Sequence, residues 1–189
     1  GPLGSVILVA SGKGGVGKST IAANIALALK EEGAVVGLLD ADIYGPSQGI
    51  LLGRSGSPKP LMGRDKGIEP VLFEGLRVMS MSYLSNDATP MVWRGPMASS
   101  AVQKILTRTS WGRLDYMIID MPPGTGDIQL TISQQVQSAG AVIVTTPQDI
   151  ALLDAKKAIE MFRKVSIPIL GIVENMSEHV CEKCGHKSY

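Results

Sequence analysis

The chain alternates between short apolar runs and longer stretches in which apolar residues recur at helical spacing. The apolar runs, each of strand length, are residues 6–10, 35–40, 76–81, 114–120, 141–145 and 167–173. The helical stretches are residues 19–32, 96–109, 127–137 and 149–164, with a short helix expected near Leu51. Strands that alternate with helices through short connections form βαβ units. We therefore predict an α/β fold, a doubly wound and mostly parallel sheet with helices on both faces.

The 189 residues are enough for one domain with a substantial core. Because 44% of the residues are hydrophobic and only 4% are aromatic, that core must consist mainly of Val, Ile, Leu, Ala and Met. The first five residues resemble the remnant of a cleaved expression tag and are left outside the fold prediction. We assign residues 6–178 to the globular domain and residues 179–189 to a cysteine-bearing segment. Residues 53–75, rich in Gly, Pro and charge, are expected to form an excursion or a hairpin.

The charge balance narrows the range of partners. Lys and Arg number 18 and Asp and Glu 17, a formal net charge of +1, so nothing attracts the chain generally to nucleic acid or an acidic membrane. The apolar runs are far shorter than the roughly 18 to 20 residues of a membrane helix. We expect a soluble protein that binds neither nucleic acid nor membrane. Its two cysteines are too few for a disulfide framework and indicate a reducing compartment.

A glycine-rich loop connects the first predicted strand to the first predicted helix. Residues 12–19 fit the pattern G-x-x-x-x-G-K-[ST] in the strand-to-helix context that phosphate binding requires. Glycines let backbone N–H groups surround phosphate oxygens, and the helix N-terminus adds its dipole. The pattern places Lys18 on the β- and γ-phosphates of a nucleotide and Ser19 on Mg²⁺. The predicted nucleotide-binding residues are Gly12, Lys13, Gly14, Gly15, Val16, Gly17, Lys18, Ser19 and Thr20.

Three aspartates follow predicted strands near this loop. Asp40 and Asp42 come at the end of the second strand, and Asp120 ends the strand over residues 114–120. Nucleotide hydrolysis needs carboxylates at such strand ends, to order Mg²⁺ and to aim a water at the γ-phosphate. We assign Asp120 to the ordering of Mg²⁺, Asp42 to the attacking water and Asp40 to the metal shell.

The residues after Asp120 form a candidate switch. The backbone N–H of Gly124 is placed to donate toward the γ-phosphate, so residues 124–127 would report hydrolysis. Asp127 has a second interpretation, as the cap of the helix that follows.

Cys181 and Cys184 form a C-x-x-C pair with His179 and His186 nearby. The spacing lets both thiolates bind one metal, and three interpretations stay open. A structural zinc site could be completed by the histidines. A redox dithiol usually follows a strand and opens a helix, whereas this pair lies in a polar segment. An iron-sulfur cluster takes four thiolates, which two chains together would supply.

Lys13 is a second lysine that the general loop pattern does not require. With it, residues 13–20 resemble the deviant Walker A motif of the MinD-like ATPases. That resemblance implies that Lys13 reaches the nucleotide of a partner subunit, as an arginine finger does in trans.

Further similarity extends over essentially all of the chain after residue 5. The segments that carry it are residues 11–20, 40–47, 92–97, 120–127, 146–155 and 174–184. In these segments the sequence resembles the Mrp/ApbC family of iron-sulfur cluster carrier ATPases, whose mitochondrial relatives serve respiratory complex I assembly. Family members continue past the cysteine pair with a further strand and helices, so C-terminal elements of the fold are expected to be missing from a chain that ends at Tyr189.

The resemblance implies a homodimer that binds ATP in each subunit and hydrolyses it. Its catalytic residues would be Lys13, Lys18, Asp42 and Asp120. Cys181 and Cys184 of two subunits would hold a [4Fe–4S] cluster between them and pass it to apo iron-sulfur proteins.

The same resemblance assigns residues near the base of the nucleotide. Asn175 would contact adenine, with Pro147 and Gln148 close to it. Trp93 and Arg94 match the family pattern without a physical role that the sequence explains.

The leading hypothesis is therefore an ATP-hydrolysing iron-sulfur cluster carrier of the cytoplasm, or of the mitochondrial matrix for an organellar relative. One alternative is a MinD-like regulatory or partitioning ATPase, which would need an amphipathic membrane helix or a basic surface that this sequence does not display. A second alternative is a zinc-stabilised, nucleotide-dependent scaffold. Metal content separates it from the cluster carrier.

Overall fold

The computed structural model describes residues 2–42, 67–84, 95–176, 179–180 and 187–188. The predicted alternation of strands and helices is confirmed there, with boundaries that differ by one or two residues. The strands are β1 (Ser5–Ala10), β2 (Val36–Asp40), β3 (Val71–Phe73), β4 (Leu76–Ser80), β5 (Tyr116–Asp120), β6 (Gly140–Thr145), β7 (Ile169–Glu174), β8 (His179–Val180) and β9 (Lys187–Ser188). The helices are α1 (Lys18–Glu31), the 3-10 helix η1 (Met81–Leu84), α3 (Gly95–Arg108), α4 (Asp127–Gln135) and α5 (Asp149–Lys164).

Seven strands form one sheet in the order β3-β4-β2-β5-β1-β6-β7. All neighbours are parallel except β3, which runs antiparallel to β4. The first strand therefore lies inside the sheet, between β5 and β6. On one side of β1 lies β5, and β2 lies beyond β5. These two strands end in Asp120 and Asp40, respectively.

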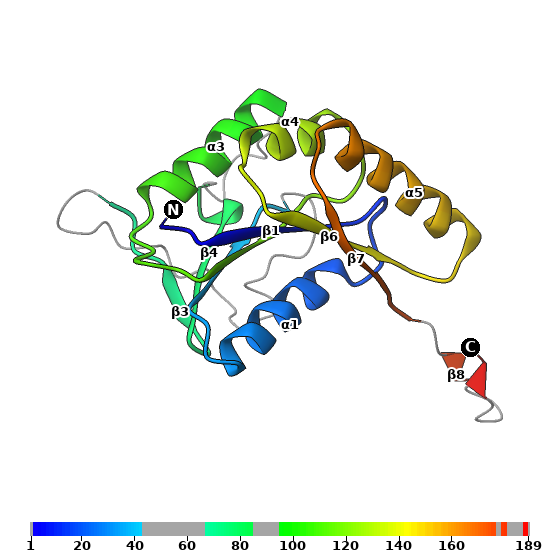
Figure 1. Cartoon of the computed structure of the whole chain (residues 1–189), viewed down its shortest axis with the longest axis horizontal. Helices are drawn as coiled ribbons and strands as arrows, with labels where there is room; N and C mark the ends of the chain where they lie inside the picture. Colours follow the sequence, from blue (N-terminus) through cyan, green and yellow to red (C-terminus); the bar gives the residue numbers. More distant parts are fainter. Residues whose placement is uncertain (1, 43–66, 85–94, 177–178, 181–186, 189) are drawn as a thin grey trace.

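Helices cover both faces of the sheet, as predicted (Figure 1). Helix α1 lies on one face, over a core cluster that includes Leu38 and Ile118. Helices α3, α4 and α5 lie on the other face, over a larger cluster that includes Leu8 and Phe162. Both clusters consist mainly of aliphatic residues and methionine, so the predicted composition of the core is confirmed.

The structure bears on two expectations about irregular segments, and the hairpin expected within residues 53–75 is confirmed for the described residues. Residues 71–73 of the expected excursion form β3, which makes a hairpin with β4, and residues 53–66 and the expected short helix near Leu51 lie outside the described residues. Residues 2–5, which lie outside the fold prediction above, do contact the domain. Ser5 begins β1, and the Pro2 carbonyl oxygen accepts a hydrogen bond from the Leu114 N–H (2.9 Å), so the residues just before β1 continue beside the residues just before β5.

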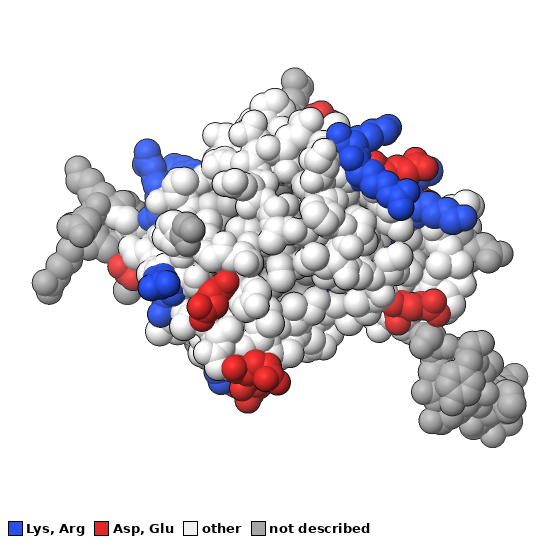
Figure 2. Space-filling model, viewed as in Figure 1, with Lys and Arg blue, Asp and Glu red and all other residues white. Residues whose placement is uncertain are grey.

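Strands β8 and β9 form a small antiparallel pair outside the main sheet (Figure 1). Cys181 and Cys184 fall between these strands in the sequence and lie outside the described residues. Figure 2 shows both signs of charge on the face turned to the viewer, with Lys and Arg gathered over α5. Among the described helices, none has the length and apolar character to cross a membrane.

Candidate functional site

The candidate site lies where β1, β2 and β5 end. In the parallel register Asp120 is level with Val9 on one side and with Asp40 on the other. The loop over residues 11–17 leaves β1 at this same edge and leads into α1. The sheet thus brings together the phosphate-type loop and the two strands that carry aspartates, as the sequence predicted.

The glycines of the loop serve different purposes. Gly15 and Gly17 have positive φ values, 76° and 79°, which other residues rarely adopt. Gly12 is required by packing, because a Cβ there would lie 2.1 Å from the carbonyl oxygen of Asp154 on α5. Gly14 is exposed, and a Cβ on it would lie 3.8 Å from Pro123 Cγ, with no closer atom among the described residues beyond its chain neighbours. The close approach of α5 at Gly12 has no signal in the sequence.

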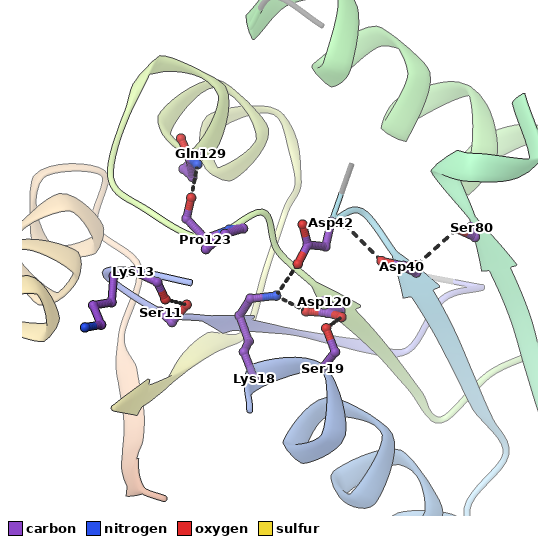
Figure 3. Close-up of polar contacts among 10 residues, drawn as sticks. All are labelled: Ser11, Lys13, Lys18, Ser19, Asp40, Asp42, Ser80, Asp120, Pro123 and Gln129. Carbon is purple, nitrogen blue, oxygen red and sulfur yellow. Dashed lines mark hydrogen bonds and ion pairs between the residues drawn. The ribbon is translucent and has the colours of Figure 1, made fainter. Parts of the chain in front are cut away.

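Lys18, the first residue of α1, provides the central contact of the site (Figure 3). It is buried, with 5% of its surface exposed. Its ammonium forms ion pairs with Asp120 Oδ1 and, at 3.4 Å, with Asp42 Oδ2. Ser19 donates a hydrogen bond to the other oxygen of Asp120, at 2.5 Å. The two buried carboxylates thereby neutralise a buried cation, the arrangement in which burial of charge is tolerated.

Asp40 lies beside this cluster and orients its neighbour. One carboxylate oxygen of Asp40 accepts the backbone N–H of Asp42 (3.0 Å), and the other accepts the hydroxyl of Ser80 at the end of β4 (3.1 Å). Ser80 Oγ in turn lies 2.8 Å from Ser82 Oγ. The structure thus gives Asp40 contacts that position the Asp42 backbone, while its assignment to the metal shell stays a prediction. Ser80 was not identified from the sequence, although a polar residue near the end of the apolar run 76–81 was a possible signal.

Lys13 extends away from the Lys18 cluster (Figure 3). Its carbonyl oxygen accepts the hydroxyl of Ser11 (2.7 Å). The carbonyl of Ser11 accepts the backbone N–H of Gly124 (2.8 Å), which therefore points at the loop. Gln129 of α4 donates to the carbonyl of Pro123, the residue before Gly124, at 2.6 Å and so connects this segment to α4.

The expectation that Asp127 caps α4 is wrong. The N-cap position is occupied by Gly126, and no side chain makes a capping hydrogen bond there. Asp127 is the first residue of the helix, where its negative charge interacts favourably with the helix dipole. Its carboxylate lies against Gly95 at the start of α3, since a Cβ on Gly95 would be 2.2 Å from Asp127 Oδ2.

The residues assigned to the base lie at the same edge. Pro147 and Gln148 follow β6 and are exposed. Asn175, directly after β7, donates from its side-chain amide to the carbonyl oxygen of Val16 (3.0 Å) and from its backbone N–H to that of Thr145 (2.8 Å). The contact with the loop was not foreseen, because 159 residues separate its partners in sequence.

For the remaining predicted residues, the structure gives no contact with the site. Thr20 is exposed on the first turn of α1. Cys181, Cys184, Trp93 and Arg94 lie outside the described residues. Among the residues that the structure does describe, no group of three or more His, Cys, Asp or Glu is placed to hold a metal ion.

A parallel sheet with this loop after its first strand and a carboxylate on the adjacent strand defines a P-loop NTPase. A family model described as NUBPL iron-transfer P-loop NTPase matches residues 3–189. The chain belongs to that family.

Solved structures share the fold. A nucleotide-binding protein from Archaeoglobus fulgidus, in complex with ADP, is 41% identical with a TM-score of 0.80, over 98% of this chain and 72% of that one. The septum site-determining protein MinD of Pyrococcus horikoshii, complexed with Mg-ADP, has a TM-score of 0.65 at 22% identity, over 90% of this chain and 69% of that one. At that identity the second similarity concerns the fold alone.

Curated relatives share more of the sequence. The iron-sulfur cluster carrier protein of Pseudomonas fragi is 61% identical over 98% of this chain and 64% of its own length. That of Escherichia coli (strain K12) is 58% identical over 96% of this chain and 49% of its own length. The iron-sulfur cluster transfer protein NUBPL of Mus musculus is 53% identical over 97% and 58%. The chain thus spans about half to two thirds of the length of these relatives.

The Lys18 ion pairs predict a large effect on stability. Lys18→Met leaves the carboxylates of Asp42 and Asp120 buried without their cation, so the free energy of unfolding should fall by about 3–5 kcal/mol in urea titrations without nucleotide. The double variant Lys18→Met/Asp120→Asn should recover part of that loss. Lys30→Met, which removes an exposed pair with Glu31, serves as the control and should change stability by less than about 1 kcal/mol. A Lys18 variant as stable as the control would contradict the pairing.

The hydrogen bond from Ser80 to Asp40 predicts a smaller effect. Ser80→Ala removes a donor from a carboxylate with 1% exposure, so stability should fall by about 1–3 kcal/mol in the same titrations. Ser133→Ala is the matched control, because that buried hydroxyl bonds only within its own helix and its loss should cost less than about 0.5 kcal/mol. Equal effects of the two variants would argue against a role for Ser80 at Asp40.

Proposed function

We propose that this chain is the nucleotide-binding part of an iron-sulfur cluster carrier that binds and hydrolyses ATP. The observation that carries the proposal is the family match over residues 3–189, which includes the loop, the aspartates and both cysteines in one continuous segment. Relatives at 53–61% identity are named as carriers or transfer proteins for iron-sulfur clusters. The proposed activity extends to this chain what those names say of the relatives.

The buried cluster supports nucleotide binding. When ATP occupies the loop, Lys18 exchanges its carboxylate partners for the β- and γ-phosphates, and the loop N–H groups surround the phosphate oxygens. Ser19 and Asp120 offer the oxygen donors that Mg²⁺ prefers, and their 2.5 Å contact places them side by side. When bound, Mg²⁺ supplies charge neutralisation for the phosphates.

The aspartates support hydrolysis. Asp42 is held through its backbone by Asp40 and can orient a water for in-line attack on the γ-phosphorus, with the bond to the bridging β,γ-oxygen breaking and ADP leaving. Gly124 donates its N–H to Ser11 in this structure and would redirect it toward the γ-phosphate. That exchange of hydrogen bonds would make residues 124–127 the switch that reports hydrolysis.

The dimer completes both sites. Lys13 lies apart from its own Lys18 cluster (Figure 3), which suits a side chain that acts on the nucleotide of a partner subunit. Cys181 and Cys184 give two thiolates per chain, and a [4Fe–4S] cluster takes four. Two subunits would hold the cluster between them and pass it to apo iron-sulfur proteins.

Metal content tests the cluster. Anaerobic reconstitution of this chain with iron and sulfide should give about four irons per dimer and a broad charge-transfer absorption in the visible spectrum. Cys181→Ala should lose both signals yet still bind ATP, while Lys157→Ala, an exposed position on α5, serves as the control and should retain them. Binding of zinc without uptake of iron would overturn the carrier proposal and favour the zinc-stabilised scaffold.

Two variants test the different roles proposed for Lys18 and Lys13. Lys18→Ala should weaken ATP binding strongly, because it removes the cation that faces the phosphates. Lys13→Ala should leave the Kd for ATP within about threefold and lower kcat by roughly 10³-fold or more, the range known for trans-acting cationic fingers. Lys156→Ala, exposed on α5, is the matched control. Equal loss of ATP binding in the Lys13 and Lys18 variants would contradict the trans assignment.

A further inference from the structure

The end of β7 is bonded directly to the phosphate loop. Asn175 Nδ2 donates to the carbonyl oxygen of Val16 at 3.0 Å, and the backbone N–H of Asn175 donates to Thr145 at the end of β6. Asn175 is thus fixed to the sheet by its backbone and to the loop by its side chain.

The bond to Val16 acts on a peptide unit of the predicted phosphate-binding loop. The carbonyl of Val16 and the N–H of Gly17 belong to one planar trans peptide, so they point in opposite directions. Holding the carbonyl from the β7 side therefore turns the N–H of Gly17 away from Asn175. Loop N–H groups of this kind cradle phosphate oxygens, and a hydrogen bond to the carbonyl strengthens the N–H as a donor.

The packing around Gly17 leaves little independent movement. Gly17 has a φ of 79°, and a Cβ on it would lie 2.4 Å from Asn175 Nδ2 and 3.7 Å from Met176 Cε. Asn175 and Met176 therefore occupy the space beside the last glycine before Lys18. A shift of the loop peptide toward β7 would therefore press on the side-chain amide of Asn175.

The same two residues begin the connection to the cysteines. Met176 has a φ of 56°, a left-handed conformation that turns the chain away from β7. Strand β8 starts at His179, and Cys181 is the next residue after that strand. The loop and the cysteine-bearing segment are thus connected through one side-chain hydrogen bond and a few residues of backbone.

We infer that Asn175 is a positioning residue that orients the Val16–Gly17 peptide for phosphate and couples occupancy of the loop to the segment carrying Cys181 and Cys184. The inference rests on the proposed function. This role differs from the adenine contact that the resemblance implies, but one Asn175 side chain can make both contacts. The amide of Asn175 keeps a second N–H and its carbonyl oxygen after bonding to Val16.

The test compares ATP with tripolyphosphate, which has the phosphates of ATP but no nucleobase. The alkylation rate of the two thiols by iodoacetamide is measured in the metal-free chain, alone and with saturating Mg-ATP or Mg-tripolyphosphate. In the wild-type chain either ligand should change the rate severalfold. Asn175→Ala should bind tripolyphosphate roughly 3- to 10-fold more weakly, the loss of about one hydrogen bond, and at saturation its thiols should no longer respond.

Two further variants make the comparison decisive. Asn175→Asp keeps the size of the side chain but lacks the N–H donor, so its thiols should also fail to respond. Asn24→Ala, an exposed position on α1, is the matched control and should respond like the wild-type chain. Urea titrations of all three variants confirm that each is folded.

The outcomes separate the inference from the proposed function. Thiols of folded Asn175 variants that still respond to tripolyphosphate would overturn the inference. Loss of response to ATP alone, with the response to tripolyphosphate intact, would also overturn it, since Asn175 would then act on the base only.

A wild-type chain that binds nucleotide and iron without any thiol response would overturn the coupling and leave the carrier proposal standing. A wild-type chain that takes up no iron would overturn the carrier proposal, whereas weaker tripolyphosphate binding by Asn175→Ala would still support the orientation of the loop peptide.

Discussion

The buried ammonium of Lys18 lies against two carboxylates that different segments of the chain deliver to one place. Asp120 ends β5, and Asp42 follows β2 by two residues. A cation at 5% exposure costs much free energy unless anions surround it, and each of these carboxylates would be equally costly without the cation. The first turn of α1 and the ends of two strands are therefore held in a fixed relation by mutual neutralisation.

The order of the strands makes that contact possible. Strand β5 comes after β4 in the chain but inserts between β1 and β2, so Asp120 lies beside the loop and Asp40 lies one strand further away. The spacing accounts for their different contacts: Asp120 meets Lys18 and Ser19, whereas Asp40 bonds to the Asp42 backbone and to Ser80 on the next strand, β4. Position in the sheet, rather than residue type, separates the roles of two aspartates that look alike in sequence.

Features that depend on local sequence patterns could be predicted, and contacts that depend on the order of the strands could not. Strands, helices and the loop after β1 were predictable because each depends on periodicity and glycine content within a few residues. The bonds from Ser80 to Asp40 and from Asn175 to Val16 depend on which strands become neighbours, and one sequence does not contain that register. Asp127 shows that local patterns can also mislead. Capping preference favoured Asp127 as the N-cap of α4, whereas Gly126 occupies that position and Asp127 is the first residue of the helix.

Contacts with other parts of the protein hold the loop at several points. Ser11 bonds to Gly124, Val16 bonds to Asn175, and Lys18 and Ser19 bond to Asp120. A pre-ordered loop loses little conformational entropy on binding. Under the proposed function, the main cost of binding is then electrostatic, because phosphate draws the Lys18 ammonium away from the buried carboxylates of Asp42 and Asp120. A divalent cation beside Ser19 and Asp120 offsets that loss at the point where it arises, so phosphate and metal should each favour the binding of the other.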